Sequence, residues 1–364
     1  MIWLDIIDPK YVMFFKSLLP ELQKLDKLLI TTRKSEEYAE CAKLLELFKI
    51  PAYEIGGYGG ASKLGKFHSR LQRQSGFLAL FKELDVLPRL FITGASVDGV
   101  QCAFGLGIPV VHFADTPVAD CTFSTQKLTI LSRLTLPLST LVFRPFVVPE
   151  ICYTSLGLHP SQVIAYHFID VVLWLQDVPS LARDCPQRVA FMREWGLDEK
   201  LPIILVREEE YKAHYVKEKL PIIYESIGLL SKWANILLMP RYGEKELESA
   251  FGEVENIHIL TQKLPPKAFY PFIDLLLGGG GTMNLEACYL GIPVISTRSL
   301  LLFHDTFLLE SKLMYHAQSA TQVQDLAQHI LAESKAHYKR DDIFAPQGVD
   351  FSSILEPIQR LLQD

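Results

Sequence analysis

Short, mostly apolar runs alternate along this 364-residue chain with segments of helical spacing. In the first half, the apolar runs lie at residues 2–6, 28–31, 52–55, 90–93 and 109–113. The pattern starts again in the second half, with runs at residues 203–206, 236–239, 257–260, 273–277 and 294–296. Strands that are apolar throughout and separated by helices are typical of parallel sheets covered on both faces. The alternation therefore predicts an α/β protein with two doubly wound, Rossmann-like parallel-sheet domains.

The length of the chain also favours two domains, because single hydrophobic cores rarely grow beyond about 250–300 residues. A proline-containing, irregular stretch from about residue 145 to 202 separates the two patterns and is the expected linker. We expect an N-terminal domain at 1–185 and a C-terminal domain at 186–350. The chain ends in an amphipathic segment, and a helix at 351–364 could pack back on the N-terminal domain.

The composition excludes several classes of protein. Apolar residues make up 49% of the chain, and the net charge of −6 argues against a general nucleic-acid binder, which needs a basic surface. The six cysteines are scattered without metal-ligand spacing, so we expect no metal and no cofactor. The N-terminus lacks a signal-peptide pattern, and no apolar run reaches the roughly 20 residues that span a bilayer. We therefore expect a soluble, cytoplasmic protein, and no sequence feature specifies its oligomeric state.

The most specific local signal is a run of four glycines, Gly278, Gly279, Gly280 and Gly281, between an apolar run and a helix-like segment. Glycine permits positive φ and brings backbone amides close to a ligand. The helix that follows adds unpaired N–H donors and the positive end of its dipole, and Thr282 is expected to cap it and offer a hydroxyl. A pyrophosphate suits such a place. The alternative is a tight strand–helix crossover that needs glycine only for packing.

Three further residues are placed to help bind a phosphorylated sugar compound. Glu286 lies one helical turn beyond Thr282, where its carboxylate could accept hydrogen bonds from the hydroxyls of a ribose. Arg207 and Arg241 each follow an apolar run of the second domain, and a guanidinium there could bind phosphate in a bidentate manner. An ordinary surface charge is the alternative for both arginines.

The segment Gly-Gly-Gly-Gly-Thr-Met-Asn-Leu-Glu-Ala, followed by Leu-Gly-Ile-Pro-Val-Ile-Ser-Thr, resembles the C-terminal motif of the family known as domain of unknown function 354. Other matching segments lie at residues 3–9, 55–60, 105–109, 132–138, 205–207, 213–215 and 239–241. That family contains predicted glycosyltransferases of the GT-B superfamily, whose two Rossmann-like domains face each other across a cleft. More distantly, the chain is similar to the lipid-linked GlcNAc transferase of peptidoglycan synthesis and to non-hydrolysing UDP-GlcNAc 2-epimerases.

The resemblance implies that the glycine loop and Glu286 hold a nucleoside-diphosphate sugar, a UDP-sugar in the related enzymes, as substrate in the cleft between the domains. The sequence departs from the family pattern where Tyr11, Met13 and Tyr58 replace histidines. A missing imidazole removes the commonest general base near neutral pH. Besides sugar transfer, a 2-epimerase-like reaction and a non-catalytic nucleotide-sugar-binding protein therefore remain as hypotheses.

Two residues are candidates for taking a proton from the acceptor. Asp8 follows the first apolar run, where it could act as a base or simply cap the next helix. His304 lies beyond the last apolar run, where GT-B proteins contact the sugar, although a lone histidine is usually structural. On the acceptor side, strand ends and matched motifs supply Asp5, Gly57, Gly59, Asp115 and Arg133. A capping, turn or ion-paired role is the alternative for each of them.

A basic, apolar segment at residues 62–89 suggests a membrane contact. Between Ile55 and Lys82 the only charged residues are Lys63, Lys66, Arg70, Arg73 and Lys82. A basic amphipathic surface of this kind can dock on anionic lipid. A solvated helix face over the core is the plainer explanation, and peripheral membrane contact through this segment is a hypothesis.

Overall fold

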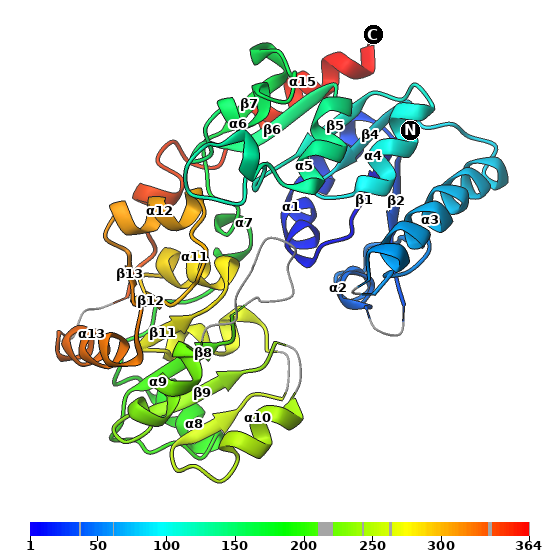
Figure 1. Cartoon of the computed structure of the whole chain (residues 1–364). Helices are drawn as coiled ribbons and strands as arrows, with labels where there is room; N and C mark the ends of the chain where they lie inside the picture. The colour runs from blue at the N-terminus through cyan, green and yellow to red at the C-terminus, as the bar shows by residue number, and fades with distance from the viewer. Residues whose placement is uncertain are drawn as a thin grey trace. The chain divides into compact units, whose positions relative to one another are not determined.

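The computed structural model describes residues 1–35, 38–60, 62–209, 221–241, 244–261, 264–333 and 337–363. The chain forms two compact units, one made of residues 1–173 and 347–364 and the other of residues 174–346 (Figure 1). The division thus falls at Leu173, before the position 185 expected from the sequence. The matching segment at 213–215 lies outside the described residues.

The first unit contains a seven-stranded parallel sheet with the order β3-β2-β1-β4-β5-β6-β7. The strands are β1 (Ile2–Asp5), β2 (Leu28–Thr32), β3 (Tyr53–Glu54), β4 (Leu90–Thr93), β5 (Val110–Phe113), β6 (Leu141–Pro145) and β7 (Val163–Tyr166). The helices are α1 (Pro9–Leu25), α2 (Glu40–Leu47), α3 (Lys63–Glu83), α4 (Val97–Gly105), α5 (Ile130–Thr135), α6 (Ile151–Thr154) and α15 (Ser352–Gln363). The short helix α7 (Val172–Leu175) spans the junction with the second unit.

Local chemistry explains the first helix and the core beside it. Asp8 caps α1 and Pro9 takes its first position, where proline's fixed φ and missing N–H cost nothing. The indole of Trp3 lies 4.7 Å from the ring of Phe77 and 4.3 Å from that of Phe91, which joins β1 to α3 and β4. Edge-on and tilted aromatic contacts of this kind stabilise a core beyond the area they bury.

The C-terminal helix belongs to the first unit. Ile354 and Ile358 of α15 are wholly buried, and their spacing of four residues places them on one face of the helix. That helix packs beside α1. The stretch at 145–202, expected to be a linker, instead contains β7 and three short helices. The strand β7 has only four residues and is flanked by Pro160 and His167, so its apolar run is too short to give a strong strand signal.

The second unit contains a six-stranded parallel sheet with the order β10-β9-β8-β11-β12-β13. The strands are β8 (Ile203–Arg207), β9 (Asn235–Met239), β10 (Ile257–Ile259), β11 (Leu275–Gly278), β12 (Val294–Ser296) and β13 (Met314–His316). The helices are α8 (Pro186–Glu194), α9 (Ile222–Leu230), α10 (Glu244–Phe251), α11 (Gly281–Tyr289), α12 (Phe303–Glu310), α13 (Ala320–Ala332) and α14 (Asp341–Phe344). The two parallel sheets with flanking helices confirm the predicted α/β class (Figure 1).

Over the described ranges of the chain, no helix is both long and apolar enough to cross a bilayer.

Candidate functional site

The carboxyl ends of four strands of the second unit are in register. Arg207 pairs with Met239 on one side and with Gly278 on the other, and Gly278 pairs with Ser296. Ligands of open parallel sheets bind outside the carboxyl ends of the strands. The residues at and just beyond this row therefore make up the candidate site.

The glycines at 278–281 are needed for close packing rather than for unusual backbone angles. Positive φ occurs at other described glycines, such as Gly291 at 76°, and not at these four, so the expectation of positive φ here is wrong. A Cβ atom on Gly279 would lie 2.4 Å from the Cα atom of Glu209, and one on Gly278 would lie 1.8 Å from Oδ1 of Asn284. The packing explanation therefore accounts for the first two glycines.

The last two glycines face guanidinium groups. A Cβ atom on Gly280 would lie 2.6 Å from Nη2 of Arg241, and one on Gly281 would lie 3.3 Å from Nη1 of Arg298. Helix α11 begins here with Gly280 as its N-cap, and no described side chain caps it. Thr282 is inside the first turn, so its expected capping role is wrong. The open helix start and two cations thus meet at one place, which suits a phosphate group.

Arg207 adds a third cation beside the loop. Its Nη1 donates to the carbonyl oxygen of Pro240 at 2.5 Å and more weakly to that of Met239 at 3.4 Å. The Cγ atom of Arg207 would be 3.9 Å from a Cβ atom on Gly280, so its side chain passes the same glycine as Arg241. The structure therefore brings together the two arginines that the sequence singled out.

Glu286 lies in the second turn of α11, and two hydrogen bonds hold its carboxylate. Its Oε1 accepts a hydrogen bond from Nε1 of Trp174 at 2.8 Å, and its Oε2 accepts one from the hydroxyl of Tyr270 at 2.7 Å. Burial raises the pKa of the Glu286 carboxyl, although these two bonds and the charge of Arg207 act in the opposite direction. A carboxylate has about four acceptor positions, so both oxygens can accept a further bond from a ligand hydroxyl.

Arg298, which the sequence did not single out, is paired with Asp305, the neighbour of His304. Arg298 is 8% exposed, and its Nη1 donates to Oδ2 of Asp305 at 2.5 Å. The same Oδ2 accepts the backbone N–H of Leu302 at 2.8 Å, which fixes the carboxylate at the start of α12. Arg298 follows β12 as Arg207 ends β8, so the strand-end rule that indicated the other two arginines also indicates this one. His304 precedes Asp305 in the first turn of α12 and is half-buried.

Two buried glutamates, also missed, position the segments around the loop. Glu208 accepts the backbone N–H of Arg241 at 2.7 Å and the hydroxyl of Tyr224 at 2.6 Å. Glu209 accepts both the backbone N–H and the hydroxyl of Ser299, each at 2.8 Å. Through these bonds to neutral donors, the two carboxylates hold the chain after β9 and β12 in place.

In the first unit, Asp5 is enclosed by its hydrogen-bonding partners. It is wholly buried, and its two oxygens accept bonds from Nη2 of Arg73 at 2.8 and 3.1 Å. Nη1 of Arg73 donates to Asp98 at 3.2 Å, and the hydroxyl of Thr31 donates to Asp5 at 2.7 Å. Burial raises the pKa of Asp98, against the effect of Arg73. The structure thus gives Asp5 an internal ion-pairing role.

Asp8 and Asp115 lie around Lys10. The Asp8 carboxylate accepts the backbone N–H of Lys10 at 2.9 Å, which is the capping arrangement that the sequence left open. The Nζ atom of Lys10 lies 2.5 Å from a carboxylate oxygen of Asp115 and 2.5 Å from one of Asp170. Burial lowers the pKa of Lys10, but these two carboxylates outweigh it and the net shift is upward. Lys10 therefore neutralises part of the charge that Asp115 would offer a ligand.

The remaining candidates of the first unit make local contacts. Arg133 donates to the carbonyl oxygens of Thr125 at 2.6 Å and Leu128 at 3.3 Å, so it fixes the loop before α5. The carbonyl oxygen of Gly57 accepts the hydroxyl of Ser69 at 2.7 Å. A Cβ atom on Gly59 would lie 2.3 Å from the carbonyl oxygen of residue 65, so this loop is packed against the start of α3.

The residues that replace family histidines also have structural partners. Tyr11 is buried and donates its hydroxyl to the carbonyl oxygen of Phe113 at 2.9 Å. The ring of Tyr58 lies 5.7 Å from that of Tyr38, with the guanidinium of Arg33 5.4 Å from its centroid. Met13 is half-buried in α1. Tyr11 and Tyr58 thus make packing and stacking contacts at positions where the resemblance leads us to expect histidine.

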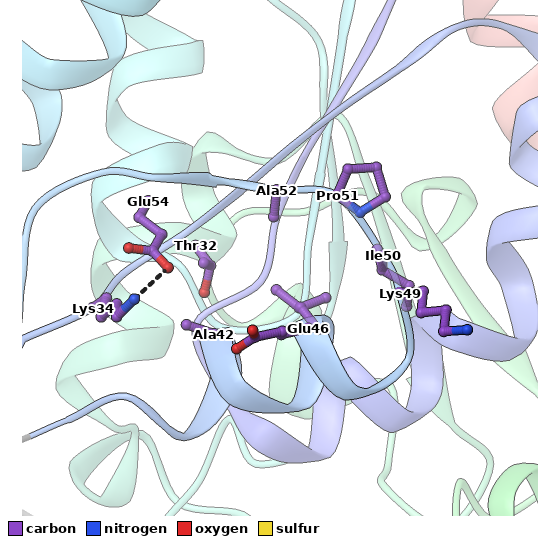
Figure 2. A pocket seen from close by; sticks show the side chains of 10 residues that line it. Thr32, Lys34, Ala42, Glu46, Lys49, Ile50, Pro51, Ala52 and Glu54 are labelled. Carbon is purple, nitrogen blue, oxygen red and sulfur yellow. Dashed lines mark hydrogen bonds and ion pairs between the residues drawn. The ribbon is translucent and has the colours of Figure 1, made fainter.

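A hollow in the first unit lies at the β3 edge of the sheet and contains none of the predicted site residues. Figure 2 shows Lys34 and Glu54 among the residues that line it, and their side chains form an ion pair of 2.9 Å. The lining residues are Thr32, Lys34, Ala42, Leu45, Glu46, Lys49, Ile50, Pro51, Ala52 and Glu54. Because its facing charges at Lys34 and Glu54 pair with each other, we assign no ligand to it. Within the described ranges, no group of three or more His, Cys, Asp or Glu side chains is placed to hold a metal ion.

Comparison with known proteins gives a family and a fold. The model of the family described as "protein of unknown function (DUF354)" matches residues 1–347. The uncharacterized protein MJ0665 of Methanocaldococcus jannaschii is 26% identical over 326 residues, which cover 88% of this chain and 89% of that protein.

Among solved structures, a putative UDP-N-acetylglucosamine 2-epimerase of Listeria monocytogenes has a TM-score of 0.72 at 14% identity, covering 100% of this chain and 96% of that one. The UDP-GlcNAc 2-epimerase of M. jannaschii, in complex with UDP-GlcNAc and UDP, has a TM-score of 0.70 at 16% identity. The match covers 100% of this chain and 99% of that one. These likenesses show a GT-B-like α/β fold, as predicted. The match over residues 1–347 places the chain in the domain of unknown function 354 family.

Proposed function

We propose that this protein is a glycosyltransferase that moves a sugar from a nucleoside-diphosphate sugar, a UDP-sugar, to an acceptor hydroxyl. The observation that carries the proposal is the convergence of Arg207, Arg241 and Arg298 on the open start of α11 at Gly280 and Gly281. A diphosphate presents several negatively charged oxygens to such a place. Guanidinium groups and helix N-terminal amides are the donors that bind these oxygens best.

Each group has a separate task in this proposal. The amides of the first turn of α11 and the guanidinium groups of Arg241 and Arg298 bind the two phosphates, and Arg207 supports them from the β8 side. When the bond between sugar and phosphate breaks, negative charge grows on the leaving diphosphate. Donors fixed in advance around that charge lower the barrier, because they need no reorganisation during the reaction. Glu286, held by Trp174 and Tyr270, accepts a ribose hydroxyl.

Asp8 and His304 are the proposed proton acceptors. Desolvation raises the pKa of Asp8, against the effect of Lys10, which brings a carboxylate closer to the working range of a general base. His304 precedes Asp305, the carboxylate that orients Arg298, and histidine is the side chain most often used as a general base. The variants Asp8→Asn and His304→Gln, which place an uncharged amide at each position, decide between them. The variant that lacks the proton acceptor should lose turnover and keep nucleotide binding.

A UDP-sugar 2-epimerase-like reaction is the second candidate. It is favoured by the solved structures of similar fold, which include 2-epimerases with TM-scores of 0.70 and 0.72. It would use the same diphosphate site but needs acid and base groups on both sides of the sugar. The replacement of family histidines by Tyr11, Met13 and Tyr58 counts against it.

The binding test is calorimetric titration of the whole chain with UDP and UDP-GlcNAc. We expect Arg241→Gln and Arg298→Gln each to weaken UDP binding about 10- to 150-fold, which corresponds to about 1.5–3 kcal/mol for a hydrogen-bonded charge. Arg133→Gln is the matched control, since Arg133 lies in the first unit and donates to the loop carbonyl oxygens of Thr125 and Leu128. Unchanged affinity in both site variants, or no UDP binding by the wild type, contradicts the proposal.

The reaction is then identified by its products. The protein is incubated with nucleotide sugars, with and without a mixture of sugar and lipid acceptors. Release of nucleoside diphosphate only with an acceptor indicates transfer. A sugar nucleotide isomerised at C2 indicates the epimerase reaction. Saturable binding without any product indicates a non-catalytic nucleotide-sugar-binding protein.

A further inference from the structure

Helix α3 has a row of exposed apolar side chains on its outer face. Leu64 is 80% exposed, Phe67 57%, Leu71 50% and Leu78 50%. Their spacing of three, four and seven residues places them along one side of a helix. The inner face of the same helix is separately filled, because Phe77 is wholly buried in the core of the first unit. The outer row is therefore not used by the core.

Cations accompany the N-terminal part of this row. Lys63, Lys66 and Arg70 each directly precede one of its apolar residues, so they form a parallel row beside it. The helix has no acidic residue before Glu83 at its last position. The ion pair of Arg70 with Asp98 is long, at 3.9 Å. Desolvation lowers the pKa of Lys66, and the charges of Arg70 and Arg33 lower it further, as expected where cations gather.

One basic residue of the segment has a different place. Arg73 is wholly buried between Asp5 and Asp98, so it contributes nothing to the outer surface. The remaining pattern is an apolar row flanked by three cations at one end. A second copy of this face carries no acidic residue before Glu83, so it offers these cations no complementary charge. The charge pattern instead complements an anionic surface.

We propose that the outer face of α3 docks on an anionic phospholipid bilayer, lying in the plane of the interface. Leu64, Phe67 and Leu71 enter the boundary between headgroups and acyl chains, while Lys63, Lys66 and Arg70 contact the phosphates. A helix of 21 residues is roughly 32 Å long, which gives an extended contact along the membrane surface. This inference is independent of the proposed sugar-transfer function, because it uses no residue of the second unit.

Vesicle flotation with the full chain tests the inference. We expect the protein to float with phosphatidylcholine vesicles that contain roughly 30% phosphatidylglycerol at about 50 mM salt, and to be released at about 500 mM salt. Pure phosphatidylcholine vesicles should bind at least about tenfold less. Failure to bind the anionic vesicles at low salt overturns the inference.

Paired variants separate the apolar and the ionic contributions. Phe67→Ser with Leu71→Ser should reduce partitioning at least about tenfold, since both side chains are half-exposed and their loss spares the core. Leu47→Ser is the control, because Leu47 is 70% exposed on another helix of the same unit. Equal partitioning of the double variant and the control contradicts the inference. A dimer in light scattering that only the double variant disrupts, without vesicle binding, would identify a second copy as the occupant instead.

Discussion

Two alanine substitutions in the glycine loop separate packing from anion binding. In Gly279→Ala, the new methyl group would lie 2.4 Å from the Cα atom and 2.5 Å from the backbone nitrogen of Glu209. These atoms belong to the chain that leaves β8, and they can move only by disturbing the sheet register. Overpacking of this kind costs about 1–3 kcal/mol. For a domain of this size we expect the melting temperature to fall by roughly 2–12 °C, at about 2–4 °C for each kcal/mol.

Gly281→Ala should behave in the opposite way. Its methyl group would lie 3.3 Å from Nη1 of Arg298, a contact that a small shift of the guanidinium relieves. Alanine also favours a helical position over glycine by up to about 1 kcal/mol. We therefore expect a melting temperature equal to or slightly above that of the wild type. The displaced guanidinium should nevertheless weaken UDP binding about 3- to 10-fold, or about 0.6–1.4 kcal/mol.

Thermal melts with and without UDP measure both effects in one experiment. A ligand that binds only the folded protein raises the melting temperature with its occupancy, so the UDP-induced increase reports affinity. Should Gly279→Ala melt like the wild type, the packing argument for the loop is refuted. Should Gly281→Ala keep the full UDP-induced increase, the diphosphate is not held where α11 begins.

Three other substitutions test buried ionisable side chains. Arg73→Met leaves Asp5 buried without its cation, and we expect urea denaturation to show a loss of about 3–5 kcal/mol in the free energy of unfolding. Burial lowers the pKa of the His112 imidazole to about 4, so the neutral form is favoured in the fold. The stability that this provides is present above about pH 6.5 and is lost as the pH falls through 4, and the loss is up to about 3 kcal/mol. His112→Leu should therefore make the urea midpoint less dependent on pH below about 6.5. Asp305→Asn weakens the hold on Arg298 and should reduce UDP affinity about 3- to 10-fold in a titration.

Each of these substitutions has an exposed counterpart. Arg70→Met, at a surface ion pair of 3.9 Å, should cost less than about 1 kcal/mol. His329→Leu and Asp325→Asn change exposed residues of α13 and should leave the pH profile and the UDP affinity unchanged. Equal effects of a buried substitution and its counterpart would show that burial is not the cause.

The arginines show which features of the site can be predicted from the sequence. Arg207 and Arg241 are predictable because each follows a clear apolar strand, and the carboxyl ends of parallel strands meet at one edge. Arg298 obeys the same rule, yet its strand is only three residues long, so the signal is weaker. Arg73 looks like its basic neighbours in α3, and only the fold shows that two aspartates, 68 and 25 residues away, enclose it. Burial of a charge depends on such distant partners, which no local pattern contains.

The sequence predicts the place of the glycine loop correctly, but the physical reason for its glycines is different from the predicted one. The sequence indicates a site where a strand meets a helix, and it suggests glycine for positive φ. The register explains the requirement instead: Gly278 is level with Arg207 on β8, so the chain after β11 runs against the chain after β8, and a side chain at Gly279 would strike Glu209. That close approach also sets the start of α11 beside the arginines. Packing and anion binding are therefore two consequences of one strand register, and this is why a substitution that tests the second must leave the first intact.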